Sequence, residues 1–413
     1  MKYEQSNKQR VVLVSELFYP EQTATAYIMT KIARELNSEF SLLILTVTKK
    51  EHAHCLEQDR MFSSENTVIK RILLPAFDKN KLVFRTIRLL LATLGLGLYT
   101  LLFARRSDIV FTVTNPAPLI LLLAIVQKIR GFKLVFLVHD IFPENATAAG
   151  IITSKGKLYS WVKKSFDWAY SVADLIITIG RDMSEIISQK CPGSIEKITL
   201  IENWAEKSLM ECKSYNSRSE YGSFPSKNIV IQYAGNIGRT QGLLDFLDIV
   251  SETRNKCVDF NFRGTGALFD QLKSKISDRS NFSIAGGYSR REQVKVLENC
   301  DIALVILSRN MYGLGVPSKT YNLMALGKPI LYVGPVNSEI YRLVVSEKIG
   351  WAFSWDEQEE LIQFVNNLSI KDKPKIASFG DKAKKLAQDN FNEEGQLSKF
   401  RKCFCEIRDR NET

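Results

Sequence analysis

The segment VHDIFPENATAAG, residues 138–150, groups side chains that can exchange protons or make polar contacts. His139 and Asp140 end an apolar run, and Glu144 comes directly after a proline. An imidazole can donate, accept or change charge near neutral pH, so a histidine at a strand end suits contact with a reacting group. The alternative is that Asp140 and Glu144 cap the following loop while His139 fills a gap in the packing.

Two glycine-containing turns in the second half could admit a ligand. In YAGNIGRTQGL, residues 233–243, Gly238 lets backbone amides approach an anion, and Arg239 offers planar donors that suit phosphate. In FRGTGAL, Gly264 and Gly266 could admit a flat base. The alternative is an ordinary turn between strand and helix in both places, with Arg239 in solvent.

A third segment, VPSKTYNLMALGKPI at residues 316–330, is the most specific. Its first residues are typical of a helix start, with Ser318 at the boundary and Lys319 in the first turn. Unpaired N–H groups and the helix dipole favour an anion there, and Lys319 adds a full positive charge. We expect phosphate binding at this helix start, with a ribose near Asn322, whose amide can hydrogen-bond hydroxyls.

The loop after the first expected strand, YPEQTATAY at residues 19–27, contains no glycine. The G-x-G-x-x-G fingerprint of dinucleotide binding is therefore absent, which argues against a nicotinamide or flavin enzyme. Thr23 and Thr25 precede a helix, so their hydroxyls either cap it or contact a ligand.

The spacing of histidine and cysteine argues against a metal centre. The cluster HAHC, at residues 52–55, has no second pair of ligands nearby. The seven cysteines form no C-x-x-C pair, which suits reduced thiols in a cytosolic compartment. We expect no metal and no cofactor.

Apolar β-rich runs alternate with stretches of helical period, which predicts an α/β protein with parallel sheets. Residues 205–227 interrupt this pattern with polar residues, Gly and Pro, and are typical of a linker. We therefore expect two doubly wound, Rossmann-like domains, at 1–204 and 228–390, followed by a C-terminal helix at 391–413. Their ligand should bind in the cleft between them. The expected strands are 11–18, 41–47, 67–73, 108–113, 133–140, 174–180 and 198–203, then 228–235, 258–264, 282–287, 300–307, 329–334 and 350–354.

The charge pattern indicates an anionic partner, since 56 basic residues face 45 acidic ones and the net charge is +11. Residues 82–104 are the most apolar window and have only basic charges at their flanks. Its run from Leu89 to Ala104 is shorter than the roughly 20 residues that span a bilayer. We expect a helix lying on an anionic membrane surface, the alternative being a buried helix of the sheet sandwich. Nucleic acid is not expected, because the basic residues are not interleaved with aromatic ones.

Taken together, YAGNIGRTQGL, FRGTGAL and VPSKTYNLMALGKPI, in that order and spacing, resemble segments of glycosyltransferase family 4, which comprises retaining enzymes of GT-B fold. VHDIFPENATAAG is similar to the D-x-W-P-E segment of the branch that builds bacterial surface polysaccharides, with Phe142 in place of tryptophan. IENWAE, at residues 201–206, resembles the N-W-x-D segment of that branch, with Glu206 in place of aspartate.

The resemblance implies a role for each candidate residue. The implied catalytic set is His139, Asp140, Arg239 and Lys319. The implied contacts with the sugar nucleotide come from Gly238, Gly264, Gly266, Ser318 and Asn322. Contacts with the donor sugar or the acceptor would come from Thr23, Thr25 and Glu144.

The implied function is transfer of a sugar from a nucleotide-diphosphate donor to a polyprenyl-diphosphate-linked acceptor in O-antigen, capsule or colanic-acid assembly. UDP is the expected nucleotide, an N-acetylamino sugar is one candidate, and the expected location is the cytoplasmic face of the cell membrane. Two departures keep alternatives open: the family's paired glutamates are replaced by Leu314 and Asn322, and the lysine after the phosphate arginine is absent. The alternatives are a GT-B sugar-nucleotide 2-epimerase and a non-catalytic paralogue that acts as a scaffold.

Overall fold

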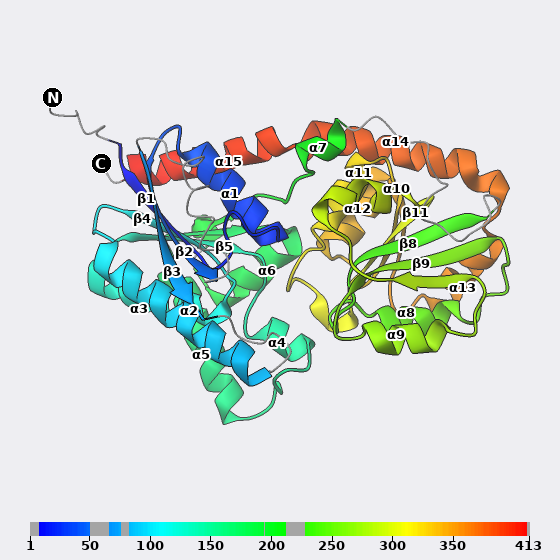
Figure 1. The fold of residues 1–413 in the computed structure, drawn as a ribbon, viewed down its shortest axis with the longest axis horizontal. Coiled ribbons are helices and arrows are strands. Elements are labelled where there is room, and N and C mark those ends of the chain that lie inside the picture. The colour runs from blue at the N-terminus through cyan, green and yellow to red at the C-terminus, as the bar shows by residue number, and fades with distance from the viewer. Residues whose placement is uncertain (1–7, 50–65, 76–81, 194, 212–227, 411–413) are drawn as a thin grey trace.

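The structure is a computed structural model that describes residues 8–49, 66–75, 82–193, 195–211 and 228–410. Two parallel β-sheets lie in two domains, and helices cover both faces of each sheet (Figure 1). The predicted α/β fold with two doubly wound domains is therefore confirmed.

The first sheet has seven parallel strands in the order β3-β2-β1-β4-β5-β6-β7. Strands β4, β5 and β6 are buried along nearly their whole length, as expected for apolar strands with helices on both faces. The strands are β1 (Arg10–Ser15), β2 (Ser41–Lys49), β3 (Thr67–Leu74), β4 (Ile109–Val113), β5 (Lys133–Val138), β6 (Leu175–Thr178) and β7 (Ile198–Leu200). The helices are α1 (Ala24–Leu36), α2 (Leu82–Phe103), α3 (Ala117–Arg130), α4 (Glu144–Ala148), α5 (Lys157–Val172), α6 (Arg181–Lys190), η3 (Ile195–Lys197) and α7 (Lys207–Met210).

The second sheet has six parallel strands in the order β10-β9-β8-β11-β12-β13. Its strands are β8 (Ile229–Asn236), β9 (Val258–Thr265), β10 (Phe282–Ala285), β11 (Ile302–Ile306), β12 (Ile330–Val333) and β13 (Gly350–Phe353). Its helices are α8 (Leu243–Val250), α9 (Phe269–Ile276), η4 (Arg290–Glu292), α10 (Gln293–Glu298), η5 (Arg309–Met311), α11 (Lys319–Ala325), α12 (Glu339–Glu347), α13 (Gln358–Asn367) and η6 (Ile370–Asp372).

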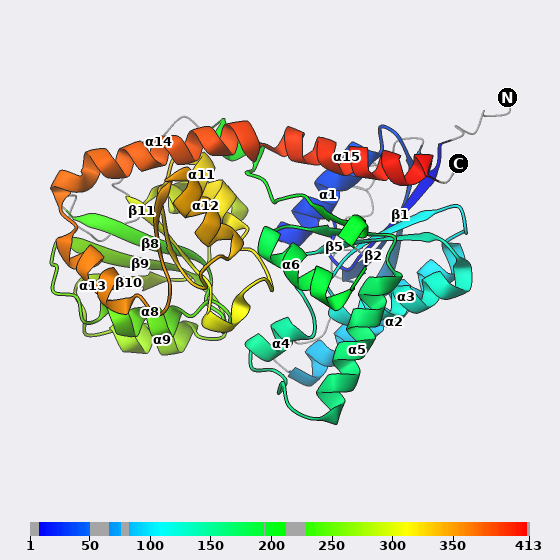
Figure 2. The ribbon, with the colours of Figure 1, turned by 180° about the vertical axis from the view of Figure 1, so that it is seen from behind.

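The winding direction reverses once in each sheet. Strand β1 lies between β2 and β4 in the first sheet, and β8 lies between β9 and β11 in the second. Ligands of open α/β sheets bind beyond the carboxyl ends of the strands at such a switch point. The loops at these ends meet between the two domains (Figure 2), so the site is expected there.

Two long helices at the C-terminus join the domains along one side (Figure 1). Helix α14 (Lys373–Asn390) packs on α11 of the second domain, and α15 (Glu393–Asp409) packs on α1 of the first. Asn392 separates them and caps α15, because its side chain accepts a hydrogen bond from the Gly395 amide at 2.7 Å. The chain therefore returns to the first domain after completing the second.

The expected linker over 205–227 is only partly described, because residues 212–227 lie outside the described residues. Ala205 forms an isolated parallel bridge with Asn392, and α7 follows it. The segment that leaves the first domain is thus held against the start of α15.

By length and composition alone, helix α2 is long and apolar enough to cross a membrane. Of its Thr86–Phe103 stretch, 28% is buried inside the protein. Ala92 and Leu96 face the sheet and are fully buried, whereas Leu94 and Leu98 are 60% and 53% exposed. The helix therefore covers the first sheet with one face and presents an apolar second face to the outside.

Candidate functional site

A cavity of about 310 Å³ lies between the domains, where β5, β8 and β11 end. We call it the strand-end cavity. The first domain contributes the loop after β5, and the second contributes the ends of β8 and β11 together with the loop into α11. Its polar lining comes from His139, Asp140, Asn145, Asn236, Thr240, Gln241, Ser318, Lys319 and Thr320.

His139 reaches this cavity because β5 ends directly before it. Its backbone N–H donates to Thr114 Oγ1 at 3.1 Å, which fixes the turn. Its side-chain Nε2 is buried and has no hydrogen-bond partner among the described residues. Burial lowers the pKa of His139 to about 4, so the imidazole is neutral near pH 7 and can still donate or accept.

Asp140 lies beside His139 and is oriented by a neighbour. The Asn145 side chain donates to Asp140 Oδ1 at 2.6 Å. Burial raises the pKa of Asp140 to about 6, and the hydrogen bond from Asn145 opposes that rise. Asp140 is therefore mainly ionised near neutral pH, close to the point where it takes up a proton.

Lys319 comes from the opposite domain, at the start of α11. Its Nζ donates to the Tyr288 hydroxyl at 2.9 Å and lies 5.0 Å from the centre of that ring. No carboxylate pairs with Lys319 among the described residues, and burial lowers its pKa to about 8. A partly desolvated ammonium group without a counter-ion is well placed to bind an anionic ligand. Ser318 lines the cavity beside it.

Arg239 and Gly238 do not line the strand-end cavity, which corrects the expected geometry of their loop. Arg239 is exposed, and the Gly238 amide donates to Gln241 Oε1 at 3.1 Å. Instead, Thr240 and Gln241 of the same loop line the cavity. The sequence identified the correct loop but not which of its residues turn inward.

Gly264 and Gly266 do not line the strand-end cavity. Close packing of the backbone explains why glycine stands at these two positions. A Cβ atom on Gly264 would approach Gly235 O to 1.8 Å, and one on Gly266 would approach Ile237 O to 2.3 Å. These glycines allow β9 and its following loop to lie against β8. The expectation that they line a base pocket is not met in this conformation.

The three remaining candidates also lie away from the strand-end cavity. Thr23 caps α1, because its Oγ1 accepts from the Ala26 amide at 3.2 Å, and Thr25 lies in the first turn of α1. Glu144 is held by Lys190, whose Nζ lies 2.6 and 2.8 Å from the two carboxylate oxygens. Thr23 thus caps its helix, as its alternative predicted, whereas Glu144 pairs with Lys190 instead of capping the following loop.

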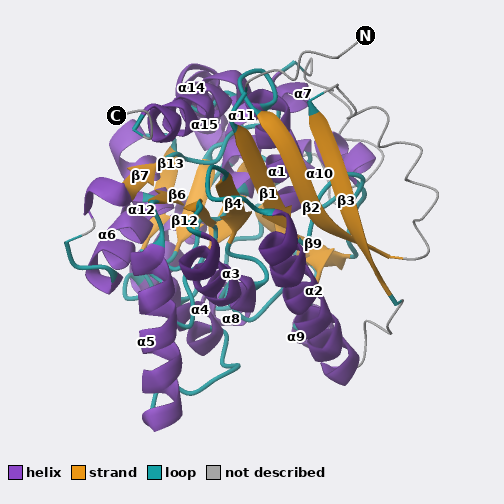
Figure 3. Cartoon of the chain, turned by 90° about the vertical axis from the view of Figure 1, so that its left-hand side faces the viewer, coloured by secondary structure: helices purple, strands orange, loops and turns teal. Residues whose placement is uncertain are grey.

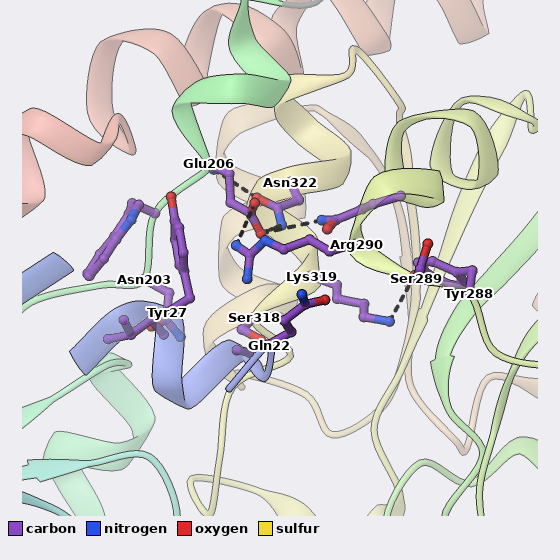
Figure 4. A pocket seen from close by; sticks show the side chains of 14 residues that line it. Gln22, Tyr27, Asn203, Glu206, Tyr288, Ser289, Arg290, Ser318, Lys319 and Asn322 are labelled. Atoms are coloured by element: carbon purple, nitrogen blue, oxygen red, sulfur yellow. Dashed lines mark hydrogen bonds and ion pairs between the residues drawn. The ribbon is translucent and has the colours of Figure 1, made fainter. Parts of the chain in front are cut away.

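A second cavity, of about 200 Å³, adjoins Lys319 from the other side (Figure 4). We call it the linker cavity, because Asn203, Trp204 and Glu206 line it together with α1, α11 and the segment after β10. Ser318 and Lys319 line both cavities. The two cavities therefore meet at the start of α11.

Asn322 lies in the linker cavity and is paired with Glu206 (Figure 4). Its Oδ1 accepts from the Glu206 amide at 2.9 Å, and its Nδ2 donates to Glu206 Oε1 at 3.1 Å. Arg290 pairs with Glu206 Oε2 at 2.7 Å, and its guanidinium lies 4.1 Å from the centre of the Tyr27 ring. A polar network from both domains thus surrounds this cavity.

Sequence reasoning missed Tyr288, Arg290 and Gln241. The first two follow a short strand in GGYSRRE, where nothing in the local spacing marks a site. Among the described residues no group of three or more His, Cys, Asp or Glu side chains could hold a metal ion. The HAHC cluster at 52–55 lies outside the described residues.

Comparison with known proteins identifies one relative that matches nearly the whole chain and one that matches about half of it. WbjE of Pseudomonas aeruginosa, a glycosyltransferase by its name, is 32% identical over 406 residues, which cover 95% of this chain and 97% of WbjE. WcaI of Escherichia coli K12, named as a glycosyl transferase of colanic acid biosynthesis, is 23% identical over 226 residues, covering 53% of this chain and 55% of WcaI. No family model matches the chain, so membership of glycosyltransferase family 4 stays a prediction.

The fold of this chain matches the folds of solved glycosyltransferase structures. HepE from Anabaena in complex with UDP and glucose matches 96% of this chain and 100% of HepE, with a TM-score of 0.69 and 15% sequence identity. WaaG, a glycosyltransferase involved in lipopolysaccharide biosynthesis, matches 95% of this chain and 99% of WaaG, with a TM-score of 0.64 and 10% identity. The chain is a glycosyltransferase of GT-B fold and belongs to the family that includes WbjE.

Proposed function

We propose that the protein is a retaining glycosyltransferase that moves a sugar from a UDP-linked donor to a polyprenyl-diphosphate-linked acceptor. The observation that carries this proposal is the strand-end cavity. There the neutral imidazole of His139 and the mainly ionised carboxylate of Asp140, both from one domain, face Lys319 of the other. The name of WcaI, which refers to colanic acid biosynthesis, supports a place in bacterial surface-polysaccharide assembly. The HepE structures with UDP and with UDP-glucose support the choice of donor.

In the proposed reaction the bond between the sugar C1 and the diphosphate oxygen breaks, and a bond from C1 to the acceptor oxygen forms on the same face. The acceptor hydroxyl loses its proton to the leaving diphosphate. Lys319 balances the charge that develops on the diphosphate, and a preorganised cation in a partly dry site is effective in this role. His139 and Asp140 contact the sugar from the opposite wall.

Donor binding requires rearrangement of the loop after β8. The Gly238 amide is occupied by Gln241 Oε1, and Arg239 lies in solvent. A diphosphate that displaces Gln241 would gain the Gly238 amide, and inward rotation of Arg239 would add a second cation. Arg239 and Gly238 therefore act in the donor-bound state of this proposal.

Two assays test the proposal. A panel of UDP-, GDP- and dTDP-sugars is first screened for an increase in melting temperature, because a true donor stabilises the folded state by mass action. The best donor is then incubated with a polyprenyl-diphosphate-linked saccharide, and the anomeric configuration of the product is determined by NMR. Transfer with the donor's configuration supports the proposal. An inverted product, or conversion of the donor without acceptor as a 2-epimerase would give, contradicts it.

We further propose that the first domain rests on an anionic membrane at the cytoplasmic face. Helices α2, α3 and α5 lie on the same side of this domain (Figure 3), and α3 packs against both of the others. Apolar side chains along them are exposed: Leu90, Leu94, Leu98, Leu102, Ile125, Ile129, Leu158, Trp161 and Trp168. Exposed basic residues flank them: Arg105, Arg106, Lys128, Lys155, Lys157 and Lys164. Apolar and basic side chains together favour the interface of an anionic bilayer.

A further inference from the structure

Helices α6 and α12 meet N-terminus to N-terminus across the domain boundary (Figure 2). The Arg181 amide at the start of α6 donates to Glu339 Oε2 at 2.7 Å. In return, the Glu339 amide at the start of α12 donates to Asp182 Oδ2 at 3.1 Å. Each helix is therefore capped by a carboxylate from the other domain, and we call this pair of contacts the reciprocal cap.

Neither N-cap residue caps its own helix, although Asp182 Oδ1 also accepts from the Met183 amide of α6 at 2.8 Å. The residue before α6 is Gly180, which has no side chain, and the one before α12 is Ser338, whose hydroxyl hydrogen-bonds Tyr332 at 2.7 Å. The first N–H groups of a helix have no partner within the helix, and carboxylates are the acceptors that the helix dipole favours. The ends of α6 and α12 thus depend on the contact between the domains.

The reciprocal cap is tightly packed. Asp182 and Glu339 are only 1% and 3% exposed, and the Arg181 guanidinium holds both oxygens of Glu339 at 2.9 and 3.0 Å. A Cβ atom on Gly180 would lie 2.8 Å from Val316 and 3.1 Å from Glu339 Cβ. The backbones approach so closely that a shift between the domains would break these contacts.

The same face of α6 also holds the loop that leads to Lys319. The Tyr312 hydroxyl donates to Glu185 Oε2 at 2.7 Å, and Gly313 packs so closely on α6 that a Cβ atom there would lie 2.9 Å from Asp182 O. Leu314 O then accepts from the Ile141 amide, just after Asp140, at 3.2 Å. The next residues of the chain enter the strand-end cavity and end at Ser318 and Lys319.

We propose that the reciprocal cap sets the spacing of the two domains and thereby holds Lys319 opposite His139, which makes Asp182 a positioning residue for sugar transfer. This inference rests on the proposed function of the strand-end cavity. Asp182 touches neither cavity described above. It acts through α12, because its carboxylate accepts from the Glu339 amide, and it holds the position of α6, against which the loop from Tyr312 to Ser318 packs.

The charged neighbours explain why two carboxylates can be buried together. Arg181 of α6 supplies positive charge by pairing with Glu339 at 2.9 Å, while Arg342 of α12 ties the same two helices together by pairing with Glu185 at 2.9 Å. The two helix N-termini supply partial positive charge. Repulsion between Asp182 and Glu339 is offset by these groups as long as the domains stay in contact.

The test uses Asp182→Asn and Glu339→Gln, which keep side-chain size but remove a charge and one acceptor oxygen. Small-angle X-ray scattering is expected to show a larger radius of gyration for both variants than for the wild type. Turnover is expected to fall about tenfold or more, since a misplacement near 1 Å can cost on the order of a hundredfold. UDP affinity, measured by calorimetry, is expected to change less than about threefold. The cap does not contact UDP; it positions the groups of the two domains for the transition state.

Glu347→Gln is the matched control, since Glu347 is exposed at the far end of α12. It must leave scattering and turnover unchanged. The double variant Asp182→Asn/Glu339→Gln is expected to lose no more turnover than the worse single variant, because both carboxylates belong to one structure.

Folded Asp182→Asn protein with wild-type scattering and wild-type turnover would overturn the proposal. A loss of turnover matched by an equal loss of UDP affinity would overturn it too, since Asp182 would then act on donor binding. A wild-type enzyme that transfers no sugar would refute the proposed function alone, because the scattering comparison needs no activity.

Discussion

At the scale of single residues, Lys319 is the group on which the proposed donor binding depends most. It lacks a carboxylate partner among the described residues, and burial lowers its pKa to about 8. Below that pH the ammonium form predominates and attracts the diphosphate. Above it the neutral amine predominates, so the Kd for UDP should rise by up to about tenfold per pH unit, as expected for a single required proton. Calorimetric titration of UDP from pH 7 to 9.5 measures this.

Lys319→Arg is the control for that pH dependence, because a guanidinium stays charged throughout the range. The variant should bind UDP with a flat profile even if it binds less tightly. A wild-type affinity that stays constant up to pH 9.5 would show that Lys319 does not hold the diphosphate.

Gln241 gives a second prediction at this scale. It lines the strand-end cavity in the loop from which the family's lysine is absent, and its Oε1 accepts from the Gly238 amide. Gln241→Lys should lower the donor KM by roughly three- to tenfold, since a charged donor to a phosphate is about twice as strong as a neutral one. Steady-state kinetics measures this, with Gln388→Lys on exposed α14 as the control. An unchanged or higher KM would contradict it.

The sequence predicted His139, Asp140, Ser318 and Lys319 in the cleft between the domains, and all four line the strand-end cavity, because strand ends and helix starts follow from apolar runs and turn residues. It could not place the inward-facing residues of the loop after β8, since loop conformation depends on packing against distant elements. It also attributed Gly264 to ligand binding and did not reveal the contact with Gly235 across the sheet, which by itself requires a glycine at this position. Local spacing does not reveal such backbone contacts.

At the scale of elements, the predicted strands of both sheets are all present among the described residues, with ends that differ by a few positions. The expected strand over 174–180 is shorter, at Leu175–Thr178, because Gly180 is already the N-cap of α6, which begins at Arg181. Parallel strands covered on both faces are nearly continuous apolar runs, which makes them easy to find. Their ends are set by loop contacts, which the sequence alone does not show.

The apolar face of α2, α3 and α5 leads to a prediction about membranes. Leu94 and Leu98 on α2 and Trp161 on α5 are 60%, 53% and 69% exposed. The triple change Leu94→Ser, Leu98→Ser and Trp161→Ser should reduce binding to vesicles of anionic phospholipid by at least about tenfold, since each buried side chain contributes about 1.5–3 kcal/mol. Co-sedimentation with these vesicles measures the loss.

Val345→Ser is the control for this experiment, because Val345 is 53% exposed on α12 of the other domain. It should bind vesicles like the wild type. Equal binding of wild type and triple variant, or no binding of the wild type at all, would contradict a membrane-facing role for these helices.

At the scale of the whole molecule, the chain ends on the domain where it began. Phe404 of α15 is fully buried and meets Phe111 and Phe40 edge to face at 5.2 and 6.2 Å between ring centres. Phe404→Ala should therefore destabilise the first domain by about 3–5 kcal/mol, the usual range for an aromatic core residue. Urea unfolding followed by circular dichroism measures this, with the exposed Lys402→Ala as the control. A change below about 1 kcal/mol would mean that α15 does not complete the first core.

The relation between the domains was the least predictable feature. The pairing of Asp182 with the start of α12, and of Glu339 with the start of α6, joins residues 157 and 158 positions apart in the chain. Nothing in either segment marks it, because both carboxylates look like ordinary acidic residues in a first helical turn. The contact exists only once both sheets have folded and met.

A crystal structure of the protein with UDP would test most directly where the donor binds. We predict that the diphosphate lies in the strand-end cavity with an oxygen within hydrogen-bond distance of Lys319 Nζ, and that the Gly238 amide has exchanged Gln241 for a phosphate oxygen. A diphosphate bound elsewhere, with Lys319 still held by Tyr288 and the cavity empty, would contradict the proposed site.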